Sequence, residues 1–224
     1  MFMHSSLIVL DFETTGMSPN LGARPTEVAA VRIENGRIVD RFQSLMDAGV
    51  YVPAFITELT GISNAMVRNA PPINRVMRAL HGFIDGQPIV AHNAQFDRKF
   101  LEAEWRRLRL PMASTVLCSL LVSRRIYPDV ASHKLGALVE YLNLPRTGRY
   151  HRALADAEMT AHLWLRMAAE IADRFGYDSV PLSLVEQLQS IAKHRATNYL
   201  KSYRERLDQA VSGDRPVGMQ PSRG

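Results

Sequence analysis

An apolar run that ends in acids constrains the fold of this chain most. Residues 6–12 read Ser-Leu-Ile-Val-Leu-Asp-Phe, and the turn Thr14–Gly16 follows directly after Glu13. A short apolar segment bounded by a turn is typical of a buried central strand. Because alternate side chains of a strand share a face, Asp11 and Glu13 leave the same side of the sheet, where they repel each other unless cations lie between them. Ordinary surface acids are the alternative, and the buried run argues against it.

Two further acids stand where a helix can hold them rigid. Asp97 lies near the expected start of a helix, where a helix-capping acid is the alternative. Asp156 lies on a largely apolar helix stripe, on which a lone charge needs a partner. This stripe also carries Thr160, Leu163 and Met167. His151 precedes Asp156 by five residues in an expected loop, and a histidine can accept a proton near neutral pH.

Together these side chains predict a metal centre. Four carboxylates from three segments could cage two divalent cations: Asp11, Glu13, Asp97 and Asp156. Oxygen-only ligands suit Mg²⁺ or Mn²⁺. Two such ions can clamp the attacking and leaving oxygens of a phosphodiester, with His151 as the base beside them. We therefore interpret the chain as a metal-dependent nuclease.

The three motifs, in this order, resemble those of the DEDDh 3′–5′ exonucleases. They are Asp-x-Glu-Thr-Thr-Gly from Asp11, His-Asn-Ala-x-Phe-Asp from His92 and His-x-Ala-x-x-Asp from His151. This ribonuclease-H-like group includes the proofreading (epsilon) subunit of bacterial DNA polymerase III, ribonuclease T and oligoribonuclease. The similarity runs over about residues 7–167 and includes the further landmarks at 59–62 and 132–135.

The resemblance implies an α/β fold, with a mixed β-sheet flanked by helices, and it implies roles for the site residues. Asp11 would bridge both metals, Glu13 would bind the metal that holds the attacking water, and Asp97 would bind the leaving-group metal. Asp156 would complete the ligands and His151 would be the base. Substrate contacts are implied for Thr14, Thr15, Gly16 and Thr60. At this last position the proofreading subunit has a histidine, so the contact would be changed in kind.

Composition limits the class of protein. The chain has 224 residues, a net charge of +5 and a pI near 9.6, which permits a polyanionic partner. Cys118 is the only cysteine, so no intrachain disulfide is possible and a reducing compartment such as the cytoplasm fits. No apolar run is long enough for a membrane span, and residues 1–6 lack the basic start of a signal peptide.

The order of expected elements favours a mixed sheet with helices. A hairpin turn at residues 34–37 would join two strands, and Pro72 would precede an amphipathic helix. Ser132 is the expected N-cap of a later helix. We expect strands at 27–33, 38–45 and 88–92, and helices from about 73, 95 and 135 and over 154–174.

The chain divides into an exonuclease domain at 1–173, a helical extension at 174–211 and a Gly-, Pro- and Ser-rich tail at 212–224 that is expected to be disordered. Within the extension, residues 183–209 are predicted to form one helix with an apolar stripe. The stripe consists of Leu188, Ala192, Ala196, Tyr199, Tyr203 and Leu207. It must pack on its own domain, on a second copy in a homodimer or on a polymerase partner.

The predicted reaction is hydrolysis of the terminal phosphodiester at a 3′ end of DNA, preferably single-stranded, which releases nucleoside 5′-monophosphates. The same chemistry on RNA is an alternative, because a 2′-hydroxyl is read by only a few local contacts. A metal-free binding module and a polymerase accessory or scaffold subunit are further alternatives. Basic clusters at 106–109 and 124–125 are interpreted as solvated helix faces rather than phosphate clamps.

Overall fold

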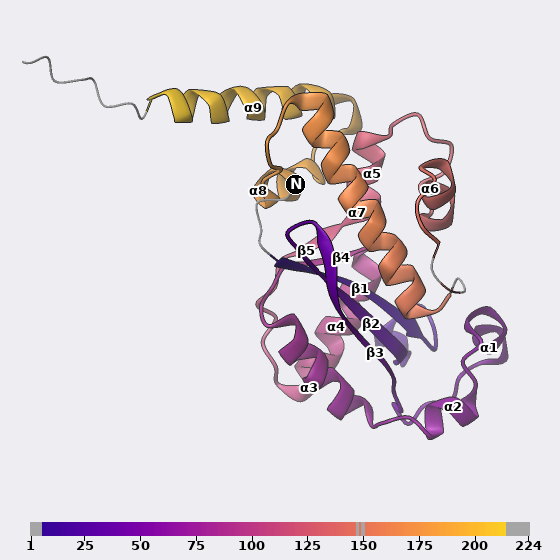
Figure 1. Ribbon diagram of the computed structural model, residues 1–224. Coiled ribbons are helices and arrows are strands. Elements are labelled where there is room, and N and C mark those ends of the chain that lie inside the picture. Colours follow the sequence, from indigo (N-terminus) through magenta and orange to yellow (C-terminus); the bar gives the residue numbers. More distant parts are fainter. Residues whose placement is uncertain (1–5, 147, 149–150, 214–224) are drawn as a thin grey trace, which may run out of the picture.

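The computed structural model describes residues 6–146, 148 and 151–213, and a five-stranded sheet forms its centre (Figure 1). The strand order is β3-β2-β1-β4-β5, with β1–β2 and β2–β3 antiparallel and β1–β4 and β4–β5 parallel. The strands are β1 (Ser6–Thr14), β2 (Pro25–Glu34), β3 (Arg37–Leu45), β4 (Ile89–Ala91) and β5 (Val116–Cys118). The predicted mixed sheet is confirmed. The expected tail lies, from residue 214, outside the described residues.

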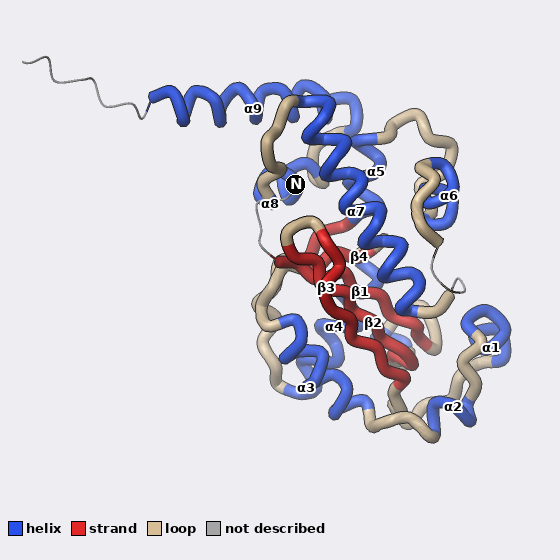
Figure 2. Tube along the Cα trace, in the orientation of Figure 1, coloured by secondary structure: helices blue, strands red, loops and turns tan. Residues whose placement is uncertain are grey.

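Helices flank the sheet, as Figure 2 shows. They are α1 (Ala54–Thr60), α2 (Asn64–Arg68), α3 (Ile73–Ile84), α4 (Gln95–Leu108), α5 (Ser119–Ile126), α6 (Leu135–Tyr141), α7 (Ala153–Phe175), α8 (Leu182–Leu188) and α9 (Ala196–Gly213). Short 3₁₀ turns occur at Pro19–Leu21 and Lys193–Arg195. In the part of the chain that the structure describes, no helix combines the length and the apolar character needed to cross a membrane.

Strand β1 separates two apolar cores. Leu7 and Val9 lie in the core that α5, α7, α8 and α9 share. Ile8 and Leu10 point to the other face and lie in the core formed with α3 and α4. This alternation is the ordinary period of a strand that is buried on both sides. It also means that the odd-numbered residues of β1, including the two acids at its end, face α7.

Most of the expected elements are found close to their predicted positions. Asn35 and Gly36 form the β2–β3 hairpin turn with left-handed φ angles of 48° and 76°. Strand β5 was not predicted, because three residues are too few for a periodic signal. The prediction of Ser132 as the N-cap was wrong, because Lys134 occupies the N-cap position of α6. Ser132 Oγ instead accepts a hydrogen bond from the Lys134 N–H at 3.4 Å.

The expected single helix at 183–209 is two helices, α8 and α9, separated by residues 189–195. Tertiary hydrogen bonds hold the break. Gln189 Oε1 accepts from the Cys118 N–H at 3.0 Å, and Arg125 Nε donates to the Ile191 carbonyl at 2.8 Å. The prediction of one continuous helix is therefore wrong, because contacts with α5 outweigh the local helical pattern.

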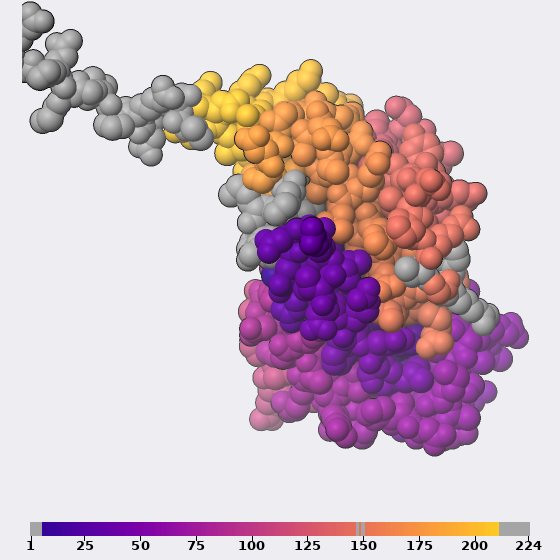
Figure 3. Space-filling view, viewed as in Figure 1, coloured from indigo at the N-terminus to yellow at the C-terminus, as the bar shows by residue number. Residues whose placement is uncertain are grey.

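Part of the apolar stripe packs on the chain itself. Leu188 and Ala196 of the stripe, and Leu200 beside it, are buried in the core that contains α7, and Tyr199, Tyr203 and Leu207 of the stripe pack against that core. The Tyr177 hydroxyl donates to the Leu200 carbonyl at 2.6 Å and fixes α9 against the end of α7. The outer part of α9 carries mostly exposed side chains and extends beyond the body of the molecule (Figure 3).

Candidate functional site

The end of β1 carries two carboxylates toward the start of α7. In the β1–β2 register, Asp11 lies opposite Ala29 and Glu13 lies opposite Glu27. Asp11 and Glu13 are both partly exposed, while Phe12 between them is buried on the other face of the sheet. The strand therefore holds both carboxylates on one side, as the sequence predicts.

The start of α7 supplies Asp156, and the residues just before the helix supply His151. The His151 N–H donates to Asp156 Oδ2 at 3.1 Å, which fixes the loop before the helix to the helix itself. His151 has a left-handed φ of 60°, a region that histidine enters more often than most side chains. Ligand atoms of Glu13, His151 and Asp156 all lie within 4.8 Å of one another. The strand end and the helix start thus converge on one point.

Asp97 reaches the same place from the opposite face of the sheet. It lies in the first turn of α4, is 3% exposed, and accepts a hydrogen bond from the Phe12 N–H at 3.1 Å. Because Phe12 lies between Asp11 and Glu13, this bond ties Asp97 to the strand segment that carries them. The structure therefore brings all of the predicted acidic residues to one end of the sheet.

The carboxyl groups are poorly solvated and repel one another. Burial raises the pKa of Asp11 well above its usual value, and the charges of Asp97 and Asp156 raise it further. Burial also raises the pKa of Glu13 to about 8, with the charges of Asp156 and Glu27 adding to the effect. At neutral pH this cluster holds protons unless another positive charge replaces them.

The other two acids behave in the same way. Burial raises the pKa of Asp97 to about 7, although the hydrogen bond from the Phe12 N–H works against it. Burial raises the pKa of Asp156, and the hydrogen bond from the His151 N–H lowers it in part. Desolvated carboxylates that crowd one another are a donor set that suits a hard divalent cation. The residues present therefore fit the metals that the resemblance implies.

A cavity of about 640 Å³ opens over these groups. Asp11, His151 and Asp156 line it together with the basic residues Lys134 and Arg146. Its walls thus combine acids that suit a cation with bases that suit a phosphate. A volume of this size is typical of ligand sites in proteins.

The residues predicted to contact substrate have local bonds of their own. Thr14 Oγ1 donates to the Gly16 carbonyl at 2.7 Å, and Thr15 Oγ1 accepts from the Arg24 N–H at 3.0 Å. Thr60 is 1% exposed, and its hydroxyl donates to the Ile56 carbonyl at 2.8 Å. The Thr60 hydroxyl is therefore buried in the turn that ends α1. A substrate contact from Thr60 stays a prediction.

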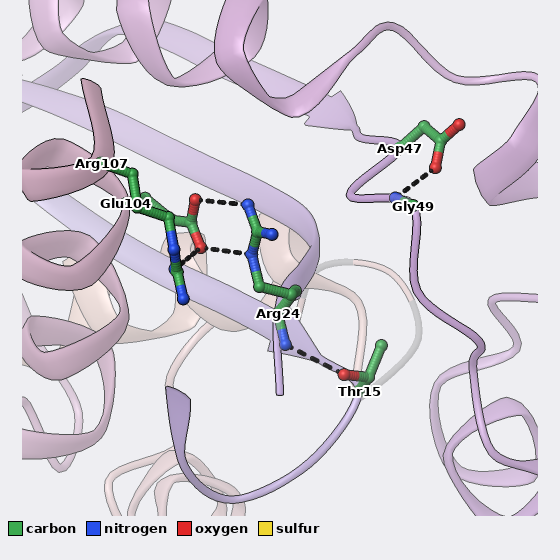
Figure 4. A network of polar contacts seen from close by, with 6 residues as sticks. All are labelled: Thr15, Arg24, Asp47, Gly49, Glu104 and Arg107. Carbon is green, nitrogen blue, oxygen red and sulfur yellow. Dashed lines mark hydrogen bonds and ion pairs between the residues drawn. The ribbon is translucent and has the colours of Figure 1, made fainter. Parts of the chain in front are cut away.

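A polar network fixes the loop after β1 to the helix that carries Asp97 (Figure 4). Arg24 forms two bonds with the buried carboxylate of Glu104 on α4, at 2.7 and 2.8 Å, and Arg107 Nη1 adds a third at 2.6 Å. Because Arg24 also donates its backbone N–H to Thr15, the network joins the turn beyond Glu13 to α4. It therefore holds two of the three segments of the site in register.

Glu27 lies beside the site and was not predicted from the sequence. It is fully buried, accepts bonds from Arg152 at 2.8 and 3.0 Å, and accepts a third from the Ala153 N–H at 3.2 Å. Burial alone would raise its pKa, but the hydrogen bonds from Arg152, Gln43 and Ala153 outweigh it and hold the pKa below its usual value. A lone acid in a strand of apolar residues was the available signal. Glu27 anchors the first turn of α7, and with it the flanking His151.

Comparison with known proteins decides the family. Residues 8–164, which contain all three motifs, match the family described as Exonuclease. The chain belongs to this exonuclease family.

Relatives within and around this family agree with that assignment. The chain is 33% identical over 199 residues to DNA polymerase III PolC-type of Caldanaerobacter subterraneus subsp. tengcongensis, covering 89% of this chain and 14% of that protein. It is 37% identical over 189 residues to the 3′-5′ exonuclease DinG of Bacillus subtilis, covering 84% of this chain and 19% of that protein. The chain thus spans less than a fifth of the length of either relative.

Solved structures show the same fold. Exonuclease X in complex with 5′ overhanging duplex DNA superposes with a TM-score of 0.61 at 27% identity, covering 77% of this chain and 95% of that one. The nuclease domain of 3′hExo, a DEDDh family member bound to rAMP, superposes with a TM-score of 0.66 at 22% identity, covering 75% and 94%. The predicted DEDDh-type exonuclease and its ribonuclease-H-like fold are confirmed.

Glu27→Gln is expected to lower activity because it loosens the start of α7, which carries Asp156 and follows His151. The substitution keeps the shape but removes the charge that binds Arg152, so we expect a loss of about 2 kcal/mol in stability and roughly a tenfold or greater fall in kcat with little change in KM. Because the pKa of Glu27 is lowered on folding, its stabilisation is present above pH 4.5 and is lost as pH falls through the folded pKa.

Thermal unfolding and steady-state kinetics of Glu27→Gln and of the surface variant Glu58→Gln would test this expectation. Glu58 is exposed on α1 and does not line the catalytic cavity. Equal kcat values for Glu27→Gln and the wild type would contradict a positioning role for Glu27.

The crowded acids also predict an unusual pH dependence of stability in EDTA. A carboxyl whose pKa is raised on folding binds its proton more tightly in the folded state, so stability falls as pH rises from the unfolded value to the folded one. For Glu13 this window runs from 4.5 to about 8. At ~1.4 kcal/mol per pKa unit, the three pH units from 5 to 8 correspond to about 4 kcal/mol, and at about 2–4 °C per kcal/mol we expect the melting temperature to fall by roughly 8–16 °C.

Differential scanning calorimetry in EDTA, with and without excess Mg²⁺, would measure this effect. Mg²⁺ should reduce the fall, because a cation favours the ionised carboxylates, and Glu13→Gln should flatten it in EDTA. A wild-type curve in EDTA that is flat or rises over the same window would contradict the assignment.

Proposed function

We propose that the chain is a metal-dependent 3′–5′ exonuclease that hydrolyses the terminal phosphodiester of single-stranded DNA and releases nucleoside 5′-monophosphates. The convergence of four carboxylates and His151 at one end of the sheet, from three separate segments, is the observation that carries this proposal, and Asp11, His151 and Asp156 line one cavity there. The relatives named as a DNA polymerase and as a 3′-5′ exonuclease support the choice of DNA and of the direction.

Four residues would hold two Mg²⁺ or Mn²⁺ ions: Asp11, Glu13, Asp97 and Asp156. When bound, such ions supply Lewis acidity to the attacking water and to the departing 3′ oxygen. The chain keeps these ligands rigid by its own bonds, since Asp97 is tied to Phe12 and Asp156 is tied to His151. This rigidity would limit the reorganisation needed during the reaction.

His151 would act as the general base. Its side chain is exposed at the cavity, and its ligand atom lies within 4.8 Å of those of Glu13 and Asp156. The imidazole would take the proton from the water that attacks the terminal phosphorus. Its backbone N–H stays bonded to Asp156, so the backbone that carries the ring would be held in place while the ring gains the proton.

The turn after β1 would receive the terminal nucleotide. Thr14, Thr15 and Gly16 leave the strand directly beside Glu13, and their own hydrogen bonds fix the backbone there. Thr60 would add a substrate contact from the turn that ends α1, where its hydroxyl also donates to the Ile56 carbonyl.

The proposal extends to the association of the enzyme with other chains and to its compartment. The outer part of α9, which extends beyond the body, is the remaining surface through which a polymerase or a second copy would associate (Figure 3). A reducing compartment, such as the cytoplasm, would suit a chain whose single cysteine, Cys118, is free and buried. Light scattering with and without residues 208–224 would test association through α9.

A product assay tests the reaction and the polymer together. Single-stranded DNA and RNA of the same sequence would each be labelled at the 5′ end and, separately, at the 3′ end, and incubated with Mg²⁺ or with EDTA. We expect a descending ladder from the 5′ label, mononucleotide from the 3′ label, and faster turnover of DNA. Faster turnover of RNA would make the chain an exoribonuclease, and full activity in EDTA would refute the metal-dependent mechanism.

A further inference from the structure

A second cavity lies directly beside the catalytic one. It has a volume of about 700 Å³, and it shares His92, Lys134 and Leu135 with the catalytic cavity. The two cavities therefore lie on either side of a shared wall. A strand whose end occupies the first cavity would have to leave it over a neighbouring surface, and this cavity is adjacent.

The side chains of the second cavity are basic. Arg124, Lys134 and Lys193 line it, and no carboxylate does so among the residues that the structure describes. Within the same described residues, none of these three cations forms an ion pair or a side-chain hydrogen bond. Most other arginines near this part of the chain do have partners, as Arg125 and Arg174 show. Three unpaired cations around one hollow favour an anionic ligand.

The cavity is built from segments far apart in the sequence. Arg124 and Arg125 are neighbours on α5, but Arg125 turns to the extension, where Nε donates to the Ile191 carbonyl at 2.8 Å. Gln189 is bonded to the Cys118 backbone at 3.0 Å, just before α5. These two bonds hold the break between α8 and α9 against α5, and so they bring Lys193 to the side of the cavity that Arg124 lines.

His92 forms a fixed neutral wall between the two cavities. Its Nε2 lies 2.9 Å from the His133 carbonyl, which can only accept, so this nitrogen carries the proton. Its Nδ1 lies 2.9 Å from Ser119 Oγ, and the Ser119 hydroxyl also donates to the Ala91 carbonyl at 3.2 Å. Burial, together with the charges of His133 and Arg124, lowers the pKa of His92 to about 4, although the hydrogen bond with the His133 carbonyl works against this. The wall therefore stays uncharged at neutral pH, and the cationic character belongs to the arginine and the lysines.

We propose that this second cavity, the upstream phosphate site, binds backbone phosphates of the substrate strand that precede the scissile phosphate, with Arg124, Lys134 and Lys193 as its ligands. The inference rests on the proposed nuclease function for the identity of the strand. Phosphates are repelled by the acids of the catalytic cavity and attracted by the cations next to them. Lys193 lies outside the stretch that matches the family, residues 8–164. The extension would therefore contribute to substrate binding.

Binding of a single strand by the full chain tests the proposal. The probe is a 5′-fluorescent oligothymidylate of about 12 nucleotides, within the range of known single-strand sites, and anisotropy is measured in EDTA at several salt concentrations. We expect Lys193→Gln and Arg124→Gln each to weaken binding about 3–10-fold at low salt. Each should reduce the slope of log Kd against log salt by about 0.7, which corresponds to one lost phosphate contact on a single strand.

Two matched variants separate a local site from general charge. Lys201→Gln removes the same charge from an exposed position on α9 that lies outside the cavity lining, and it should bind like the wild type. Lys193→Arg keeps the charge and should retain the wild-type salt slope. Circular dichroism and melting temperatures would show that the variants are folded, as expected for the exposed Lys193 and Lys201 and the partly exposed Arg124.

A substrate with a single phosphate gives the second readout. The p-nitrophenyl ester of thymidine 5′-monophosphate has no upstream phosphate, so Lys193→Gln should hydrolyse it with the wild-type kcat/KM while its KM for the oligonucleotide rises. Unchanged binding and salt slope in both cavity variants, or an equal loss in Lys201→Gln, would overturn the upstream phosphate site. If the wild type hydrolyses neither substrate but the cavity variants still lose salt-sensitive binding, the nuclease proposal fails and the phosphate site stands.

Discussion

Asp11→Asn is expected to abolish hydrolysis while leaving the protein folded. The substitution removes a ligand from the centre of the carboxylate cluster, and divalent cations supply several kcal/mol of transition-state stabilisation in such sites. Several kcal/mol corresponds to a fall in kcat of roughly 10³-fold or more. Burial and the charges of neighbouring acids raise the pKa of Asp11, so removal of its charge should also stabilise the protein in EDTA at pH 8.

The two effects have opposite signs, and that makes the experiment specific. Kinetics with Mg²⁺ and melting curves in EDTA would be compared among the wild type, Asp11→Asn and Asp173→Asn. Asp173 is an exposed acid near the other end of α7, so its variant should match the wild type in both measurements. A variant of Asp11 that unfolds earlier in EDTA, or that keeps its activity, would contradict the assignment of Asp11 to a metal cluster.

His151→Gly is expected to slow turnover by about 10²–10⁴-fold, the usual contribution of a general base, while binding of DNA stays close to normal. Glycine is the suitable replacement because His151 has a φ of 60°, which glycine adopts without strain. It also leaves the backbone N–H that bonds to Asp156 in place. The position opens directly into the catalytic cavity, so the space left by the ring is accessible to a small molecule from solution.

Added imidazole should therefore restore part of the lost rate of His151→Gly in a saturable manner. The matched control is His194→Gly, because His194 is exposed in the extension and does not line the catalytic cavity. That variant should show wild-type turnover and no response to imidazole. A normal rate in His151→Gly, or a loss that imidazole does not change, would show that His151 is not the base.

Local sequence patterns were sufficient for the parts of the site that lie within single elements. Asp11 and Glu13 were recognised because a buried strand places alternate side chains on one face. The clustering of Asp97 with them was implied by the family resemblance, and its bond to the Phe12 N–H could not be read from spacing, since 85 positions separate the two residues.

Features that depend on contacts between distant segments were missed. The role of Glu27 depends on its position opposite Glu13 on the neighbouring strand and on its bonds to Arg152, which is 125 residues away in the sequence. The break between α8 and α9 was missed because the apolar stripe continues through it, while the bonds that hold it come from Arg125 and the Cys118 backbone. Arg124 was interpreted as part of a solvated face for the same reason, since nothing near it in sequence indicates Lys193.

The packing of α8 has a consequence for how the chain can be divided. The stretch that matches the family ends at residue 164, inside α7. Leu184, Val185 and Leu188 are nevertheless fully buried in the same core as Val9 and Val31 of the sheet. A fragment cut at residue 173 would expose that apolar surface to water and would be prone to aggregate. The stretch that matches the family, residues 8–164, is therefore shorter than the stretch that shares this apolar core, which extends into α8.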